Sequence, residues 1–326
     1  MKLIIQIPCY NEAETIGLTL GELPREVEGF ESVEWLIIDD GSTDNTAVVA
    51  KNSGADHIVN LSRNKGLATA FMAGLETCLK LGADVIVNTD ADNQYDAGDI
   101  PKLVKPILDG EADIVIGARP INEVEHFSAL KRILQKFGSY VVRLVSKTNV
   151  ADAPSGFRAI SRDAAMHLNV FNEYTYTLET IIQAGQKNMT VASVPIRTNK
   201  YLRPSRLIKS IPVYLKRSIL TIIRIFVVYQ SFRFFMTIGL VSLSIGLLIG
   251  LRYAYYLIYH FITGSDIAAH VQSLILASIL IGIGFQTILV AFLADLLSVN
   301  RKLMEDIQYR LRKIGYRKGS SARKDR

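Results

Sequence analysis

Two aspartates separated by one residue, Asp90 and Asp92, directly follow a short apolar run that is typical of a β-strand. In a loop at the end of a strand, both carboxylates can turn towards one point and bind a hard divalent cation, which prefers oxygen ligands and bridges phosphates. Gln94 offers an amide oxygen to the same point. An isolated pair of this kind is more often a solvated turn, so its interpretation depends on what the chain places nearby.

A second acidic pair, Asp39 and Asp40, occupies the matching end of another apolar run. An aspartate in that place can accept hydrogen bonds from a ribose or from the N–H of a base. The sequence contains neither a GxGxxG nor a GxxxxGK[ST] motif, so it lacks the usual backbone cradles for phosphate. A diphosphate bound here would need a metal ion to neutralise its charge, which favours a metal-dependent nucleotide site.

Alternating strands and helices must position these residues. Pro8 is predicted to end the first strand, and Ser42 or Thr43 to cap the second helix. Strand–helix alternation predicts an α/β fold with a mostly parallel sheet and helices on both faces. Ligands in such sheets bind beyond the carboxyl ends of the strands, where the acidic pairs fall. We predict strands over 2–7, 34–39, 57–61, 84–88 and 113–116, and helices over 12–23, 43–52, 67–81 and 100–108.

The C-terminal part of the chain contains two segments long enough to cross a bilayer. Residues 234–251 and 271–294 carry no charged side chain over 18 and 24 positions. A hydrocarbon core about 30 Å thick needs roughly 20 helical residues. Buried core helices are the alternative, but such helices rarely stay uncharged over this length. The two segments therefore predict a transmembrane hairpin.

Basic residues are concentrated beside this hairpin. Residues 1–196 carry 17 basic and 26 acidic side chains, residues 197–233 carry nine basic and no acidic ones, and residues 300–326 carry ten basic and three acidic ones. Basic blocks that flank apolar segments fit a membrane surface better than a nucleic acid. The positive-inside rule then places the α/β domain and both termini in the cytoplasm. Two cysteines without CxxC spacing exclude a disulfide framework and a cysteine-based zinc site.

Five motifs resemble, in their order along the chain, the family-2 glycosyltransferases. They are most similar to the polyprenyl-phosphate glycosyltransferases, the group that includes dolichyl-phosphate mannose synthase and bacterial undecaprenyl-phosphate sugar transferases. The resemblance implies a GT-A fold, a nucleotide-sugar donor, Mg²⁺ or Mn²⁺ as cofactor, and inversion at the anomeric carbon. The motifs are residues 7–12 (IPCYNE), 39–44 (DDGSTD), 63–66 (RNKG), 90–94 (DADNQ) and 155–158 (SGFR).

The resemblance also implies roles for individual residues. Asp90, Asp92 and Gln94 would hold the metal, and Asp92, Asp152 and Arg158 would act at the reacting centre. Which member of the pair at 39 and 40 lines the nucleoside pocket stays open. The residues that would contact the nucleotide are Pro8, Tyr10, Glu12, Asp39, Asp40, Lys65, Asp90 and Ala91. Arginines grip phosphate well, and the candidates for binding an acceptor phosphate are Arg119, Arg132 and Arg203.

Together these features predict a membrane-bound inverting enzyme that moves a sugar from a UDP- or GDP-sugar to the phosphate of a polyprenyl phosphate. Its partners would be the donor, the lipid acceptor, the bilayer and, in a homo-oligomer, further copies of itself, but not nucleic acid. We predict a catalytic domain over 1–200, amphipathic interfacial helices over 201–233, the hairpin over 234–299 and a basic cytoplasmic tail over 300–326.

Three other functions compete with this prediction. A processive polysaccharide synthase would carry a QxxRW motif, whereas Trp35 is the only tryptophan and lies in the second predicted strand. A glycosyltransferase for another lipid or glycan acceptor would share the same motifs. A non-catalytic membrane scaffold would not need the two acidic pairs together with the SGFR motif.

Overall fold

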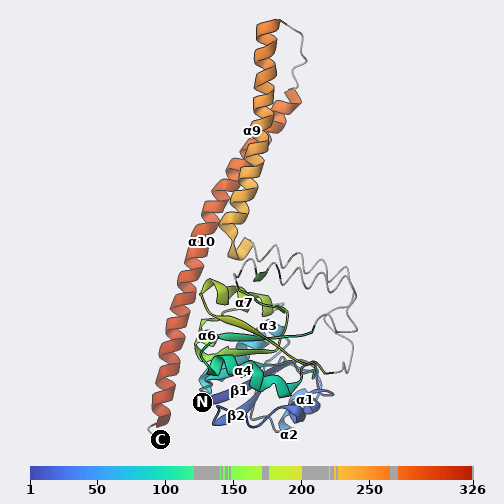
Figure 1. The fold of residues 1–326 in the computed structure, drawn as a ribbon, viewed down its shortest axis with the longest axis vertical. Helices are drawn as coiled ribbons and strands as arrows, with labels where there is room; N and C mark the ends of the chain where they lie inside the picture. The colour runs from blue at the N-terminus through green and yellow to red at the C-terminus, as the bar shows by residue number, and fades with distance from the viewer. Residues whose placement is uncertain are drawn as a thin grey trace. The chain divides into compact units, whose positions relative to one another are not determined.

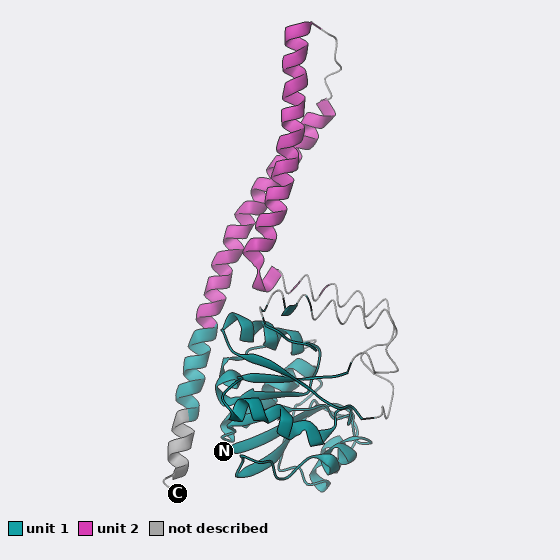
Figure 2. Ribbon diagram, in the orientation of Figure 1, with its two compact units in different colours: residues 1–219, 305–326 teal, residues 220–304 magenta. Residues whose placement is uncertain are grey.

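The structure is a computed structural model that describes residues 1–120, 148–170, 176–199, 227–264 and 271–324, together with 140, 142, 143, 146, 220 and 224, with side chains up to residue 316. The chain forms two compact units. Unit 1 consists of residues 1–219 and 305–326, and unit 2 consists of residues 220–304 (Figure 2). The predicted boundaries at 200 and 300 therefore differ from the limits of these units.

Within the described residues, unit 1 contains a seven-stranded sheet in the order β3-β2-β1-β4-β6-β5-β7 (Figure 1). Neighbouring strands are parallel, except that β6 runs antiparallel to both β4 and β5. The predicted, mostly parallel α/β sheet is confirmed. The strands are β1 (Lys2–Cys9), β2 (Ser32–Asp39), β3 (His57–Asn60), β4 (Val85–Asn88), β5 (Ile114–Ala118), β6 (Arg158–Ser161) and β7 (Val191–Pro195).

Helices cover both faces of this sheet, as predicted. On one face, Leu3 and Ile5 of β1 share a buried core with Leu20 and Leu103 from two helices. On the other face, the Gln6 side chain meets a third helix, whose Cys78 thiol donates a hydrogen bond to its Oε1 (3.8 Å). The elements concerned are α1 (Ile16–Glu22), α2 (Thr46–Asn52), α3 (Leu67–Lys80), η1 (Ala97–Asp99), α4 (Ile100–Leu108), α6 (Arg162–His167) and α7 (Thr177–Gln186).

Pro8 lies inside β1 and does not end it, which corrects the prediction. Pro8 stands opposite Ile38 of β2, whereas the pairing of β1 with β4 stops at Gln6. The carbonyl of Gln6 faces β4, because it accepts a hydrogen bond from the N–H of Thr89 (3.1 Å). Backbone groups of residues two apart in a strand point to the same neighbouring strand, so an N–H at position 8 would also point to the β4 side. The pairing of β1 with β4 has already ended there, so the N–H that Pro8 lacks is not needed for the sheet.

The second helix begins later than predicted, at Thr46 with Asn45 as its N-cap residue. Ser42 cannot cap it, because its hydroxyl donates to Asp39 and accepts a hydrogen bond from the N–H of Asn11 (2.9 Å). The first helix likewise begins at Ile16 instead of residue 12. In both cases, polar side chains that could start a helix instead bind the neighbouring loop, and this lengthens the loops at the carboxyl ends of β1 and β2.

Residues from Glu305 onward form part of unit 1, in the region where the sequence predicts a basic cytoplasmic tail over 300–326. They belong to α10 (Val271–Lys324). The Arg312 guanidinium donates to the carbonyls of Met166 (3.1 Å) and Leu168 (2.9 Å), which end α6 and lack partners within that helix. The Tyr309 ring stacks on His167 with centroids 3.6 Å apart. This part of α10 therefore packs on the α/β unit.

Unit 2 is an antiparallel pair of helices, α9 (Ser231–Thr263) and the part of α10 up to Met304. The helices approach closely at small residues, since a Cβ atom on Gly239 would lie 3.0 Å from the carbonyl oxygen of Gly284. Both are long and apolar enough to cross a membrane, and only 11% and 17% of their most apolar stretches are buried. A core helix of a soluble protein would be mostly buried, whereas most of each of these stretches is exposed.

Candidate active site

The loops that follow β1 and β2 are joined by hydrogen bonds. The Asn11 side chain accepts from the N–H of Thr43 (2.8 Å), and the N–H of Glu12 donates to the Thr46 hydroxyl (2.8 Å). Asn11 has a φ of 55°, in the left-handed region that asparagine tolerates better than most residues. These contacts hold the ends of two adjacent parallel strands as one rigid edge, which is where an α/β sheet binds ligands.

Asp39 and Asp40, the two candidates for the nucleoside pocket, are both buried and both bind backbone N–H groups. Asp39 Oδ1 accepts from the N–H of Ser42 (3.1 Å). The Asp40 carboxylate accepts from the N–H groups of Lys65 (2.8 Å) and Gly66 (2.9 Å), so it fixes the 63–66 loop. Both carboxylates therefore shape the edge of the sheet, and their contact with a nucleoside stays a prediction.

The other residues predicted to contact the nucleotide differ in exposure. Tyr10 is 39% exposed, and Lys65 is also exposed, so both can reach a ligand beyond the sheet. Pro8 is buried, and the Glu12 carboxylate accepts a hydrogen bond from the Thr15 hydroxyl (2.8 Å). Ala91 is buried as well, and its carbonyl accepts from the Thr19 hydroxyl (3.0 Å), which ties α1 to the loop after β4.

Asp90 and Asp92, at the end of β4, are close enough to repel each other. Burial and the charge of Asp92 raise the pKa of Asp90 to about 7, although Arg119, Tyr95 and Arg158 pull in the opposite direction. The Asp90 carboxylate lies against the backbone of the loop before β6, since a Cβ atom on Gly156 would stand 2.8 and 2.9 Å from its two oxygens. Two carboxylates held this close are a place where a cation lowers the energy of the site.

Residues 197–199 hold the loop that carries this pair. The N–H of Gln94 donates to Asp92 Oδ1 (3.2 Å), and the carbonyl of Gln94 accepts from the N–H of Asn199 (3.0 Å). Tyr95 forms an isolated β-bridge with Thr198. Arg197, which the sequence places in a basic block, binds Asp99 and so belongs to this packing. The loop is therefore fixed by a segment that follows the last strand of the sheet.

The donor set fits a divalent cation that also binds a ligand. Among the described residues, no three His, Cys, Asp or Glu side chains gather as a complete metal-binding group. Mg²⁺ is commonly bound by one or two carboxylates together with substrate phosphates and waters. Asp90 and Asp92 supply such a pair, and Gln94 lies on the same loop. The residues present therefore fit Mg²⁺ or Mn²⁺ as predicted, provided that a diphosphate completes the coordination.

Asp152 and Arg119 form an ion pair beside this loop. Arg119 Nε donates to Asp152 Oδ2 (2.7 Å), and Arg119 Nη2 donates to Oδ1 (3.1 Å). Asp152 is fully buried, and the Arg119 side chain is 11% exposed. Two parallel hydrogen bonds fix a guanidinium in its plane. Arg119 thus orients Asp152, and its contact with an acceptor phosphate stays a prediction.

Arg158 is fully buried, and each of its side-chain nitrogens donates a hydrogen bond to the protein. Nε and Nη2 bind the carbonyls of Ser155 (2.8 Å) and Ala153 (2.8 Å), and Nη1 binds the carbonyl of Thr177 (2.9 Å). We expected this arginine to face the reacting centre. These hydrogen bonds join the turn after Asp152 to α7, and the role of Arg158 at the reacting centre stays a prediction.

Sequence reasoning missed a buried polar network behind the two aspartates. The Gln6 side chain donates to Asn88 Oδ1 (2.9 Å), and Asn88 Nδ2 donates to the Tyr176 hydroxyl (2.8 Å) and to the carbonyl of Gly156 (2.9 Å). Tyr95 was missed too, although it directly follows the DADNQ motif. A polar side chain inside an otherwise apolar strand, as at Gln6, is the signal that could have pointed to this network.

Two predicted residues, Arg132 and Arg203, lie outside the described residues, as do most of residues 201–226. The described residues bring the other candidates together in two adjoining groups. The loops after β1, β2 and β3 carry the predicted nucleoside contacts. The loops after β4 and β5 and the turn before β6 carry Asp90, Asp92, Arg119 and Asp152, which interact electrostatically with one another or with their shared neighbours Tyr95 and Arg158.

A family model described as glycosyl transferase family 2 matches residues 4–168, about half of the chain. The chain therefore belongs to glycosyl transferase family 2, and the resemblance carried by the five motifs is confirmed. The matched segment runs from β1 to the residue after α6, so it includes both groups of candidate residues.

Relatives of the chain include an undecaprenyl-phosphate mannosyltransferase from Micrococcus luteus and a UDP-N-acetylglucosamine–dolichyl-phosphate N-acetylglucosaminyltransferase from Methanococcus voltae. Each is 30% identical to this chain, over 60% and 59% of it respectively and over 83% of the relative. A solved glucosyl-3-phosphoglycerate synthase from Mycobacterium tuberculosis, in complex with Mn²⁺, uridine diphosphate and phosphoglyceric acid, has a TM-score of 0.54 at 20% identity and covers 69% of this chain and 77% of that one. This likeness shows a shared fold.

Proposed function

We propose that the protein transfers a sugar from a nucleotide-diphosphate donor to the phosphate of a polyprenyl phosphate at a membrane surface. The observation that carries this proposal is the carboxylate pair Asp90 and Asp92 at a strand end of a family-2 glycosyltransferase whose chain also contains two apolar, little-buried helices. The names of two relatives, which act on undecaprenyl and dolichyl phosphates, support the class of acceptor.

The donor would bind across the carboxyl ends of β1, β2 and β4. Tyr10 is exposed there and can stack on a base, and the loop fixed by Asp40 presents Lys65 to the same edge. Asp90 and Asp92 would hold Mg²⁺ or Mn²⁺, which when bound would stabilise the negative charge of the departing diphosphate. The base, uracil or guanine, and the sugar are left for the assay to identify.

An acceptor that is a phosphate simplifies the chemistry. Its oxygen is anionic at neutral pH and can attack the anomeric carbon without a strong general base. The new bond forms between that oxygen and the carbon, and the bond from the carbon to the diphosphate breaks, so the nucleoside diphosphate leaves with the electron pair. Attack from the opposite side inverts the anomeric carbon. The protein must then mainly hold both reactants in line.

Arginines would bring the acceptor phosphate to this point. Arg119 stands beside the metal site, and its orientation by Asp152 prepares it for a phosphate. Arg132 and Arg203 are proposed to complete the phosphate site on the strength of the family resemblance. If Arg203 is a specific ligand, Arg203→Ala should raise the KM for the lipid far more than Lys216→Ala, whereas the KM for the donor should stay constant in both variants.

The direct test supplies the purified full chain, in detergent, with a short-chain polyprenyl phosphate and a panel of UDP- and GDP-sugars. We expect one donor to give a glycosyl phosphoryl lipid that mass spectrometry identifies, and EDTA to abolish its formation. Products only on a neutral lipid or a glycan would overturn the proposed acceptor. Nucleotide binding without transfer to any acceptor would support the scaffold alternative.

The proposed location is the cell membrane, with the catalytic unit in the cytoplasm. A single cysteine introduced by Ser265→Cys, between the two apolar helices, should react with an impermeant thiol reagent added to intact cells. Cys9 and Cys78 are buried, and burial raises the pKa of both thiols, so they should contribute little background. Labelling only after lysis would contradict this topology.

A further inference from the structure

The loop after β4 continues past its two aspartates into a short antiparallel contact with residues 197–199. Tyr95 and Thr198 form the bridge, and beside it the N–H of Asn199 donates to the carbonyl of Gln94 (3.0 Å). Even a complete two-stranded hairpin is only marginally stable on its own. A bridge of one residue pair is shorter still, so side chains must help to hold this loop.

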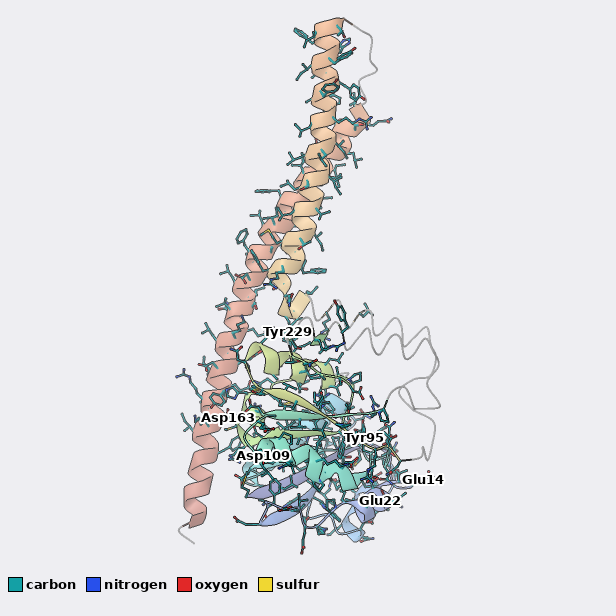
Figure 3. The ribbon with its side chains drawn as sticks, in the orientation of Figure 1. Glu14, Glu22, Tyr95, Asp109, Asp163 and Tyr229 are labelled. Atoms are coloured by element: carbon teal, nitrogen blue, oxygen red, sulfur yellow. The ribbon has the colours of Figure 1, made fainter. Side chains whose placement is uncertain are left out.

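The side-chain amide of Asn199 makes three hydrogen bonds at this contact, all to oxygen atoms. Its Nδ2 donates to the Glu22 carboxylate (3.1 Å) and, over longer distances, to Asn93 Oδ1 (3.4 Å) and the carbonyl of Tyr95 (3.4 Å). An ionised carboxylate and a carbonyl can only accept, so the NH₂ end of the amide must face them, with two protons shared among three oxygens. Figure 3 shows Glu22 and Tyr95 at the same end of unit 1.

The backbone of Asn93 makes the contact with Asn199 important. Asn93 stands between Asp92 and Gln94 in the sequence, is 6% exposed, and has a φ of 55°. This left-handed conformation is uncommon for a residue with a side chain, although asparagine tolerates it better than most, and it persists where the surrounding structure holds it. The turn at Asn93 sets the direction of the residues on either side, so contacts that hold this turn also orient Asp92.

We propose that Asn199 is a positioning residue for the metal site: its side-chain amide ties residues 93–95 to Glu22, the last residue of α1, and so keeps the Asp92 carboxylate turned towards Asp90. Asn199 acts through the loop and does not itself bind the cation. It has this role only if the two aspartates bind a metal, as proposed above.

The test compares two asparagine-to-aspartate variants of the full chain in detergent. Asn199→Asp keeps the size of the side chain but replaces the NH₂ donor with an oxygen, which would meet three other oxygens. Asn52→Asp is the matched control, because it makes the same change at an exposed residue that ends α2. Binding of Mn²⁺ is measured by electron paramagnetic resonance in the presence of UDP or of GDP, both being tested, and folding is followed by the fluorescence of Trp35.

The added negative charge gives positioning and simple electrostatics opposite signs. A carboxylate near the site would attract Mn²⁺ and lower its Kd if charge alone mattered. Loss of a group that orients a metal ligand typically weakens binding about 10- to 100-fold, and because Asn199 acts through the loop we expect the Kd to rise by about 10-fold in Asn199→Asp. The Kd should stay within about twofold in Asn52→Asp, where solvent screens the new charge.

A second variant and a rescue separate positioning from a loss of folding. Asn199→Ala removes the same donor without adding a charge, so it should also raise the Kd, and it decides the question if Asn199→Asp loses the fluorescence of the folded protein. At saturating Mn²⁺, kcat should largely recover in both variants, which a partly unfolded protein could not do.

An unchanged or lower Kd in folded Asn199→Asp, or an unchanged Kd in Asn199→Ala, would overturn the role of Asn199 and leave the proposed function standing. A rise of the same size in Asn52→Asp would overturn it too. No Mn²⁺ binding by the wild type with either nucleotide, or equal binding by Asp92→Ala, would instead overturn the metal site on which that role rests.

Discussion

The loops after β2 and β4 shift the pKa of an aspartate in opposite directions. Although burial opposes the change, hydrogen bonds from Thr46 and Ala13 hold the pKa of Asp44 below its ordinary value. In the loop after β4, burial and Asp92 raise the pKa of Asp90 to about 7. The carboxylates at this edge of the sheet are thus of two kinds. Some are stabilised by hydrogen bonds from the protein and hold loops in place, whereas others repel each other and would be stabilised by a bound cation.

This comparison predicts that mutations in the two loops separate activity from stability. A change in the loop after β4 should lower activity and leave folding intact. A change in the loop after β2 should lower the free energy of unfolding, because the backbone N–H groups would lose their acceptors. Trp35, the only tryptophan, is 5% exposed in β2 and reports the folding of the sheet by its fluorescence.

The largest effect is expected for Asp92→Ala. Its carboxylate is half-buried and accepts a hydrogen bond from the N–H of Gln94 (3.2 Å), so its loss should change stability little. Activity should fall below about one-thousandth, or about 4 kcal/mol in transition-state stabilisation, because half of the carboxylate pair is gone. Initial rates of lipid glycosylation measure this. Glu14→Ala, an exposed carboxylate at the same end of the sheet (Figure 3), is the control with unchanged rates.

A large effect on stability is expected for Asp152→Ala. The variant removes the acceptor of three hydrogen bonds from Arg119, two from its guanidinium and one from its backbone N–H. The Arg119 side chain is 11% exposed, and breaking a buried ion pair costs about 3 kcal/mol or more. Guanidinium unfolding in detergent measures it. The double variant Asp152→Ala with Arg119→Met should regain part of the loss. Additive effects of the two changes would contradict the coupling of this pair.

A smaller loss of stability is expected for Asp40→Ala. The N–H of Lys65 would lose its acceptor, and the N–H of Gly66 would keep only Asn64 Oδ1 (3.1 Å), at a cost of about 2 kcal/mol. Asp109→Ala is the matched control, since Asp109 pairs with Lys105 at the surface and such pairs contribute less than about 1 kcal/mol. If both variants unfold at the same denaturant concentration, Asp40 does not hold the 63–66 loop.

The smallest effect concerns pH. Asp99 is fully buried, and although burial opposes the change, hydrogen bonds from Arg197 and Lys102 lower its pKa to about 2. A carboxylate whose pKa is lowered by folding stabilises the protein above about pH 4, and this contribution is lost as the pH falls through about 2. Because Arg197 is exposed, solvent screening limits the contribution to about 1 kcal/mol. Asp99→Asn should be less stable than the wild type at pH 6, with the difference shrinking towards pH 2. A constant difference would exclude this linkage.

Local sequence patterns predicted the elements that depend on local chemistry. The range 100–108 and the start of the helix at Leu67 agree with the structure, because apolar spacing and neighbouring turns define them. The five expected strands are present with ends shifted by up to two residues. The acidic pairs fall at strand ends as predicted, since the carboxyl ends of parallel strands meet at one edge.

Features that depend on distant contacts could not be predicted in this way. The SGFR motif does not reveal that the Arg158 side chain donates a hydrogen bond to the carbonyl of Thr177 in α7, 19 residues away. Strand β6 inserts antiparallel between β4 and β5, which no local pattern reveals. Arg312 reads as part of a basic tail, yet its partners Met166 and Leu168 lie about 145 residues earlier, where only the folded chain brings them together.

The division of unit 1 into residues 1–219 and 305–326 has a consequence for biosynthesis. The ribosome releases the sheet first, then both apolar helices, and only afterwards Tyr309 and Arg312, which bind α6. At about 5–20 residues per second, the sheet waits roughly 5 to 20 s for these contacts, while the apolar helices are being made. The carbonyls that end α6 therefore rely on water until both apolar helices have been synthesised, and unit 1 reaches its final stability as a late event in synthesis.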